Sequence, residues 1–494
     1  MAEQLTIWTE LAPKLKINKP VRLIELFAGI GSQFKALKEL APNVESYKIC
    51  EWAYPSYCAY NAIHIKDFTD YSKDKTLEEC LEKIQGTSTD YNKPLAIKQL
   101  KAKGEERIRN AYNNIIATHN LVDITQVKGE DLAITETDKY IYIMTYSFPC
   151  QDLSLAGQLK GMSKDSGTRS GLLWEVERLL EETKVKPQIL LMENVPEVIG
   201  QNNLSDFQEW VSKLSQLGYS NFYKVLNAKD YGIPQNRRRC FMISILGDYA
   251  YEFPRKTKLK YCLEDFLEKN VDKKYFLSQR IIDFFLYNTE KQKENGNGFK
   301  FEPHNVGNTT IARTISTRSG SRMDDNFISY ESLNYYNHDQ SNRVYDPKGL
   351  APTIRTGSDD AKAIKIKNNT LKGYEIAEKG DGINISGRMQ KQRGNVQKGL
   401  CQTLKTSCEV GVIDEQPEQT NIRKLTETEC MRLMGFEDKD TQAIKDIGMK
   451  QTSIYHCAGD SIVVPCLIAL FSEFFNEQDK HIEIIDNYVE RVKN

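Results

Sequence analysis

Two apolar runs, each followed at once by chemically reactive side chains, constrain the fold of this chain most strongly. Residues 140–144 read Tyr-Ile-Tyr-Ile-Met and residues 188–192 read Gln-Ile-Leu-Leu-Met, and short apolar runs of this kind predict buried β-strands. Cys150 follows the first run within Ser-Phe-Pro-Cys-Gln, and Glu193 opens a Glu-Asn-Val segment after the second. Because ligands bind outside the carboxyl ends of the strands in an open α/β sheet, the pattern predicts an α/β fold in which Cys150 and Glu193 meet at one site.

A thiol and a carboxylic acid at one site favour addition to an electron-poor heterocycle. The thiolate is a strong nucleophile, and a nearby acid can protonate the ring that the thiolate attacks. A free cysteine is more commonly a small buried hydrophobic residue, and the chain contains 11 cysteines. The reactive interpretation of Cys150 therefore depends on the other motifs and on their order along the chain.

The first of these motifs is a glycine-bearing turn near the N-terminus. The apolar run at residues 21–26 leads into Phe-Ala-Gly-Ile-Gly, and a helical pattern of apolar residues follows. Gly29 and Gly31 let the backbone approach a ligand closely at the helix N-terminus. The third glycine of the dinucleotide fingerprint is missing, which disfavours a nicotinamide dehydrogenase and favours another nucleoside cofactor. The next apolar run ends at Glu51 and Trp52, where a carboxylate can accept from ribose hydroxyls and an indole can stack on a purine.

Together these motifs resemble those of the DNA cytosine-5 methyltransferases, which use S-adenosylmethionine. The resemblance covers about residues 20–250 and 420–475, and the blocks occur in the order of the family. It implies a Rossmann-like methyltransferase sheet with a second, smaller, mostly-β target-recognition domain. The matching blocks are residues 27–31, 51–52, 123–125, 148–151, 171–174, 193–195, 235–239, 423–436 and 459–462.

The resemblance implies a role for each residue that matches a motif. Cys150 matches the nucleophile that adds to cytosine C6, and Glu193 matches the acid that engages N3 and the exocyclic amine. Arg237 and Arg239 would lie near cytosine O2 and the catalytic carboxylate, although an arginine pair can also be a structural ion pair. Reaching cytosine in this way requires the base to leave the duplex. The cofactor contacts implied are Phe27, Ala28, Gly29, Gly31, Glu51, Trp52, Asp123, Ile124, Pro149, Leu173, Asp460 and Ser461.

Two regions are expected to contact DNA. Residues 157–171 are rich in glycine and have no helical or strand period; they suit a surface loop, and the resemblance implies a lid over the flipped base. Threonine-rich segments with apolar alternation recur at 312–317, 351–356 and 401–406 and predict short strands. They suit either DNA contact or simply a threonine-rich sheet. The expected DNA contacts are Gln151, Ser154, Gln235, Thr314, Arg355 and Lys405.

The motifs divide the chain into a catalytic domain at 1–250, a target-recognition domain at 251–422 and a segment at 423–494 that packs back on the catalytic domain. An insertion at 71–118 has helical apolar spacing and predicts two helices flanking residues 87–90. Its charges are typical of a solvated helix face. Clamping of DNA and self-association are the alternatives for this insertion.

The last block departs from the family pattern, because Asp460 stands where the family usually has asparagine. An aspartate that faced the carboxylate of the cofactor would repel it. We therefore expect Asp460 to cap the N-terminus of the following helix, with Ser461 facing the cofactor. The alternatives are that Asp460 faces the ammonium group of the cofactor or a backbone N–H.

Composition fits a cytoplasmic enzyme without a membrane segment. The net charge is −1, so any surface that binds nucleic acid must be local. The N-terminus does not resemble a signal peptide, and the cysteines and six histidines show neither a disulfide framework nor zinc spacing. We expect a monomer on double-stranded DNA that methylates C5 of a flipped cytosine in a short specific sequence. A cognate restriction endonuclease is a further candidate partner. A tRNA cytosine-5 methyltransferase and a non-catalytic DNA-binding regulator are the alternatives.

Overall fold

The computed structural model describes residues 12–91, 93–149, 153, 161–164, 170–306, 311–329, 422–477 and 479–493, and five short strands between 364 and 412. The chain forms two compact units. The first comprises residues 1–271, 308–326 and 425–494, and the second comprises residues 272–307 and 327–424.

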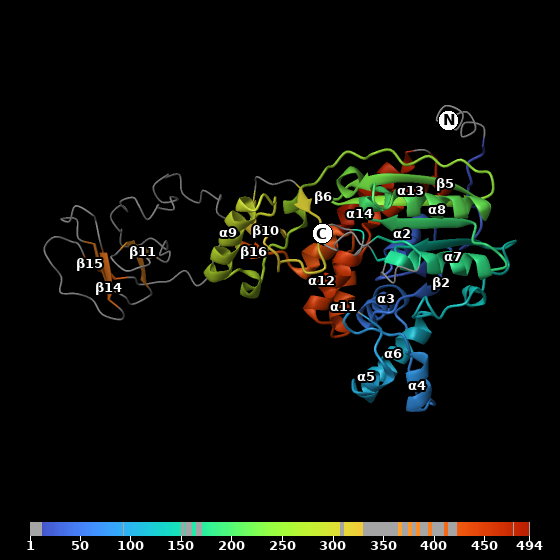
Figure 1. Ribbon diagram of the computed structural model, residues 1–494, viewed down its shortest axis with the longest axis horizontal. Coiled ribbons are helices and arrows are strands. Elements are labelled where there is room, and N and C mark those ends of the chain that lie inside the picture. The colour runs from blue at the N-terminus through green and yellow to red at the C-terminus, as the bar shows by residue number, and fades with distance from the viewer. Residues whose placement is uncertain are drawn as a thin grey trace. The chain divides into compact units, whose positions relative to one another are not determined.

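A six-stranded sheet organises the first unit (Figure 1), with the strand order β2-β1-β3-β4-β7-β5. The strands β2, β1, β3 and β4 run parallel, and β7 is antiparallel to both β4 and β5. Their carboxyl ends are aligned, since Leu26 pairs with both Cys50 and Tyr146, and Tyr146 pairs with Met192. The bounds are β1 Val21–Leu26, β2 Val44–Cys50, β3 Ile141–Tyr146, β4 Ile189–Asn194, β5 Tyr219–Asn227 and β7 Arg238–Leu246.

Helices pack on this sheet, and its central strands β3 and β4 are mostly apolar, as in sheets that are covered on both faces. Side chains alternate along each strand, so Met144 and Met192 join the core formed with α7 and α8. The helix α13 packs against α2 and α14, so residues from the C-terminal part of the chain lie with the N-terminal sheet. The bounds are α2 Ser32–Leu40, α7 Leu173–Glu182, α8 Leu204–Gln216, α13 Val464–Phe475 and α14 Lys480–Val492.

The apolar stretch Gln451–Phe475 has the length and hydropathy of a membrane span, but 89% of its apolar window is buried inside the protein. It is also divided into α12 (Gln451–Asp460) and α13. It therefore has the character of a core helix.

The insertion contains three helices where the sequence predicted two. They are α4 (Leu77–Lys83), α5 (Ile97–Lys101) and α6 (Glu105–Ala117), and they lie together beyond α3 (Tyr54–Tyr60) in Figure 1. A capping box starts α4, because Thr76 Oγ1 accepts from the backbone N–H of Glu79 and the Glu79 carboxylate accepts from the N–H of Thr76. The first unit also holds α10 (Glu427–Leu433), α11 (Asp438–Asp446) and the paired short strands β6 (Gln235–Asn236) and β9 (Ala312–Arg313).

Among its described residues, the second unit has one α-helix, α9 (Gln279–Glu294), together with small sheets. Phe285, Phe301 and Phe327 pack with ring centroids 5.3–5.6 Å apart. The strands β8 (His304–Asn305), β10 (Phe327–Ser329) and β16 (Ile422–Lys424) form one sheet. The remaining described strands form a hairpin and a three-stranded sheet; they are β11 Ile364–Lys367, β12 Tyr374–Ala377, β13 Gly382–Ile385, β14 Gly394–Gln397 and β15 Val410–Val412.

The bounds of the units differ from those expected for the domains at two places. Residues 251–271 and 308–326 belong to the first unit rather than to the second. The physical reason for the second of these is that β9 pairs with β6 in parallel, next to the arginine-rich block. A role of the second unit in target recognition stays a prediction.

Candidate active site

In the glycine turn after β1, Gly29 faces open space, whereas a Cβ atom on Gly31 would lie 2.6 Å from His64 Nε2 and from a ring carbon of Tyr60. A Cβ atom placed on Gly29 would meet no atom within 4 Å, and φ is 56° at Gly29, 78° at Gly31 and 59° at Phe27. A positive φ is unfavourable for a residue such as Phe27 and is found mainly where the surrounding structure enforces it, often at a ligand site. The turn is therefore shaped to leave a cradle at the N-terminus of α2.

Glu51, at the end of β2, is fixed against this turn. Its Oε2 accepts from the N–H of Gly29 and its Oε1 accepts from the N–H of Ala53, each at 2.8 Å. Burial raises the pKa of Glu51 to about 7, although the two backbone donors oppose the shift. Each carboxylate oxygen keeps a further lone pair, so Glu51 can still accept from a diol placed in the cradle.

Asn120 was not expected from the sequence, yet it holds the backbone of Glu51. Its Oδ1 accepts from the N–H of Glu51 at 3.0 Å and from the N–H of Val122 at 2.9 Å, and its Nδ2 donates to the Glu51 carbonyl at 2.9 Å. The only signal in the sequence is its place just before the Asp123 block. Asp123 Oδ1 accepts from the N–H and the hydroxyl of Thr125, which fixes its carboxylate at the turn after Asn120.

The two peptide carbonyls that precede Cys150 are both held by side chains. Asn194 Nδ2 donates to the Phe148 carbonyl at 2.9 Å, and Ser170 Oγ donates to the Pro149 carbonyl at 2.7 Å. The backbone that leads into Cys150 is thus fixed from β4 and from the start of α7. Ser170 was missed by the sequence reasoning, although it directly precedes the Gly-Leu-Leu-Trp block. Cys150 itself lies outside the described residues, as do the expected DNA contacts Gln151, Ser154, Arg355 and Lys405.

Glu193, at the end of β4, is buried and paired with Arg239. Arg239 Nε lies 3.0 Å from Glu193 Oε1. Burial raises the pKa of Glu193, while the positive charges of Arg239 and Arg237 oppose that shift. A buried carboxyl group with a raised pKa holds its proton more readily than an exposed one and can donate it.

Arg237 and Gln235 form hydrogen bonds with segments that are distant from them in the sequence. Arg237 is buried and donates to the carbonyls of Ile315, Gly459 and Ser461 at 2.8–3.1 Å. Gln235 is completely buried; its Oε1 accepts from the N–H of Ile315 and its Nε2 donates to the Leu433 carbonyl. The expected DNA contact of Gln235 is therefore wrong for this structure, because both ends of its amide are used inside the protein. The expected DNA contact Thr314 is exposed, and its hydroxyl donates to the Asn236 carbonyl at 2.9 Å.

The expected N-cap role of Asp460 is also wrong. Asp460 is the last residue of α12, and its Oδ2 lies 2.9 Å from Nδ1 of His456, one helical turn earlier. The next helix starts at Val464 without a side-chain cap. Ser461 ends α12 and donates its hydroxyl to the Cys457 carbonyl at 2.6 Å, so this hydroxyl does not point freely to a cofactor.

The other residues expected to contact the cofactor lie either at the site or in the hydrophobic core. Leu173 and Ile124 belong to the hydrophobic core, and Pro149 directly precedes Cys150 in the sequence. Arg237 donates to the carbonyls of Gly459 and Ser461 on either side of Asp460, which places Asp460 at the block that also carries Arg239, the partner of Glu193. The structure therefore brings the cradle at Gly29 and the carboxyl groups of Glu51 and Glu193 to one edge of the sheet.

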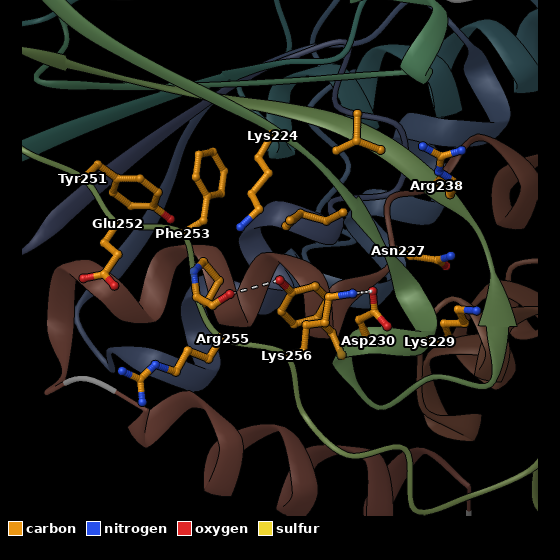
Figure 2. A pocket seen from close by; sticks show the side chains of 14 residues that line it. Lys224, Asn227, Lys229, Asp230, Arg238, Tyr251, Glu252, Phe253, Arg255 and Lys256 are labelled. Carbon is orange, nitrogen blue, oxygen red and sulfur yellow. Dashed lines mark hydrogen bonds and ion pairs between the residues drawn. The ribbon is translucent and has the colours of Figure 1, made fainter. Parts of the chain in front are cut away.

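A basic cleft of about 890 Å³ lies on the outer side of β5, beside this edge (Figure 2). Alternation along the strand turns Arg237 and Arg239 inward and leaves Arg238 exposed at the cleft. Lys256 pairs with Asp230 and Arg255 with Asp479, each at 3.0 Å. By contrast, Lys224, Lys229 and Arg238 have no carboxylate partner among the residues that the structure describes.

Together, the parallel sheet with a terminal antiparallel pair, the glycine cradle and the strand-end carboxyl groups define a Rossmann-like methyltransferase fold. A family model of C-5 cytosine-specific DNA methylases matches residues 98–476. The chain belongs to this family and is a DNA (cytosine-5-)-methyltransferase.

Known proteins resemble the chain in sequence and in structure. The chain is 34% identical to the orphan methyltransferase M.SssI of Spiroplasma monobiae over 72% of this chain and 83% of that protein. It is 36% identical to the type II methyltransferase M2.ScrFI of Lactococcus lactis subsp. cremoris over 53% of this chain and 71% of the relative. A solved structure of the Entamoeba histolytica methyltransferase EhMeth has the same fold, with a TM-score of 0.50 and 14% identity over 92% of this chain and 98% of the other.

Proposed function

We propose that the protein transfers a methyl group from S-adenosylmethionine to C5 of a flipped cytosine in a short, specific duplex sequence, through a covalent bond between Cys150 and C6. The observation that carries the proposal is the juxtaposition at the sheet edge. A buried Glu193 paired with Arg239 lies at the end of β4, and the backbone entering Cys150 is held by Asn194 from the same strand.

The residues at the cradle fit the cofactor. Gly29 faces open space, and Glu51 beside it is a buried acceptor aligned by two backbone N–H groups. Trp52 follows directly and offers an indole for stacking on the purine. Bound S-adenosylmethionine would supply an electrophilic methyl group, and its sulfur would leave as a neutral thioether when the S–CH3 bond breaks.

The side chains of this chain then divide the work on the cytosine ring. The Cys150 thiolate adds to C6, so that the S–C6 bond forms while the C5–C6 double bond opens toward C5. Glu193 delivers its proton to N3, which makes C6 more electrophilic, and Arg239 holds the resulting carboxylate. Once C5 carries the methyl group, its proton leaves to water, the double bond re-forms and the Cys150 thiolate is expelled, while the proton on N3 returns to Glu193.

The basic cleft supports duplex DNA as the substrate. Lys224, Lys229 and Arg238 offer unpaired positive charges beside the edge that carries Glu193, although the whole chain has a net charge of −1. Phosphate contacts of this kind position DNA without reading its sequence. We assign sequence reading to the second unit, and we place the enzyme in the cytoplasm as a monomer on DNA, with a cognate restriction endonuclease as a candidate partner.

Trapping on modified DNA tests the proposal. Duplex DNA with 5-fluorocytosine at the target cannot lose its C5 substituent, so the protein should remain covalently attached through denaturing electrophoresis. Cys150→Ser should abolish both the adduct and turnover. Active methyl transfer without a trapped adduct would refute the covalent mechanism, and faster transfer to tRNA than to duplex DNA would favour the alternative substrate. Bisulfite sequencing of DNA from cells expressing the protein would then identify the target sequence.

A further inference from the structure

Residues 86–91 of the insertion, here termed the insertion loop, contact three segments that form the cofactor site. The first contact is a strand-like bridge between Ala53 and Ser88. The N–H of Ser88 donates to the Trp52 carbonyl at 2.8 Å, and the N–H of Tyr54 donates to the Ser88 carbonyl at 2.8 Å. The backbone on either side of Trp52 is therefore fixed by the insertion, directly after Glu51.

The second contact is with the segment that carries Asp123. A Cβ atom on Gly86 would lie 2.6 Å from the Asp123 Cβ, so the loop passes directly against this residue. Gly86 also has a φ of 85°, which favours glycine. Both the conformation and the space at this position match a loop shaped to pack on the Asp123 turn.

The third contact is a stack on α12. The ring of Tyr91 lies on the ring of His456 with centroids 3.5 Å apart and planes 8° from parallel. The hydroxyl of Tyr91 lies 3.7 Å from Cys457 Sγ. His456 in turn lies 2.9 Å from the carboxylate of Asp460, the residue that stands in place of the usual asparagine of the family.

We propose that Tyr91 is a positioning residue for cofactor binding: it stacks on His456, so that His456 stays beside Asp460 and the Asp460 carboxylate is kept away from the carboxylate of S-adenosylmethionine. The inference rests on the proposed use of this cofactor. It assigns the insertion a role as one wall of the cofactor site, distinct from clamping DNA and from self-association.

Three observations favour this role over simple packing of a surface loop. The insertion loop contacts all three cofactor segments and not only the nearest one. The Oδ2 atom of Asp460 lies 2.9 Å from His456 Nδ1, so the position of the imidazole bears directly on the position of the carboxylate. Asp460 lies between Gly459 and Ser461, whose carbonyls both accept hydrogen bonds from Arg237, so it lies at the arginine block beside Glu193.

Calorimetric titration of S-adenosylmethionine into the full-length protein tests the inference. Tyr91→Ala should weaken binding by about three- to tenfold, as expected for loss of a stacked aromatic pair, whereas Tyr91→Phe keeps the stack and should bind as wild type. Adding Asp460→Asn to Tyr91→Ala should restore the affinity to within about twofold of wild type, because the side chain at position 460 then carries no charge that repels the carboxylate of the cofactor. Tyr71→Ala is the matched control, since Tyr71 is an exposed tyrosine of the insertion whose hydroxyl donates to Asp67.

Each outcome decides between interpretations. Unchanged cofactor affinity in Tyr91→Ala, or no recovery in the double variant, would overturn the inference. A loss of DNA affinity with unchanged cofactor affinity would show that the loop is a DNA clamp instead. Should Tyr91→Ala fail to fold, His456→Gln removes the other ring of the stack and should give the same loss and the same recovery. Absence of cofactor binding by the wild-type protein would overturn the proposed function itself, and this inference with it.

Discussion

The hydrogen bond from Ser170 to the Pro149 carbonyl gives a direct test of how the backbone before Cys150 is positioned. Ser170 is completely buried, and its hydroxyl donates to this carbonyl at 2.7 Å. Ser170→Ala removes the donor and leaves the carbonyl without it. Loss of one partner of a buried hydrogen bond costs about 1–3 kcal/mol. If about 1–2 kcal/mol of this cost raises the activation free energy, because the thiolate is less well positioned, the methyl-transfer rate should fall by about 5- to 30-fold.

Single-turnover methyl transfer with saturating cofactor and DNA measures this effect on chemistry alone. The affinity for the cofactor should be unchanged, because Ser170 contacts the Cys150 segment and not the glycine turn. Ser163→Ala is the matched control, since Ser163 is exposed and donates to Asp206 at 3.1 Å. A folded Ser170→Ala protein with a single-turnover rate within about twofold of wild type would refute the positioning argument.

Two further predictions follow from charges in the structure. Burial raises the pKa of Glu51 from 4.5, its value in an exposed carboxyl group, to about 7 in the folded protein. The contribution of Glu51 to the free energy of unfolding is therefore fully present below pH 4.5 and is lost as the pH rises through about 7. Cofactor affinity should change in the opposite sense and rise as the pH passes through 7, because an ionised carboxylate is the stronger acceptor. Calorimetry at pH 6 and pH 8 should show this rise for the wild-type protein but not for Glu51→Gln. The same change of affinity with pH in both proteins would exclude Glu51 as the ribose acceptor. In the basic cleft, Lys224→Gln and Arg238→Gln should each reduce the slope of log affinity against log salt by about one and should weaken binding to all DNA sequences alike. Lys184→Gln, at the opposite edge of the sheet, should leave that slope unchanged, and a loss restricted to one DNA sequence would instead show that the cleft reads bases.

The structure places the aspartate of the last block against a histidine of its own helix and not at the start of the next helix. Asp460 and His456 are four residues apart on α12, the spacing at which helical side chains meet. A capping role would have required the next helix to start at once, but the chain first passes through residues 461–463, and Pro465 lies in the first turn of α13. The sequence pattern favoured an N-cap role for Asp460 because it does not show that α12 extends to Asp460.

The sequence by itself determined the fold class, the enzyme family and the residues at the ends of the main strands. Apolar runs at β3 and β4 and the glycine turn after β1 are local signals, and a parallel sheet brings strand ends to one edge whatever the loops do. Glu51 and Glu193 could be predicted for this reason.

Only the tertiary structure decided how distant segments meet. Three such contacts join residues that lie 21 to 365 positions apart in the sequence: Asn120 with Glu51, Ser170 with Pro149, and Tyr91 with His456. No local pattern in the sequence predicts contacts over such separations. Burial likewise turned Gln235 from an expected DNA contact into an internal tie, because Ile315 and Leu433 supply its partners only once the chain has folded back. Sequence patterns specify which face a side chain takes along its own element, whereas the partner that it meets there depends on how the elements pack.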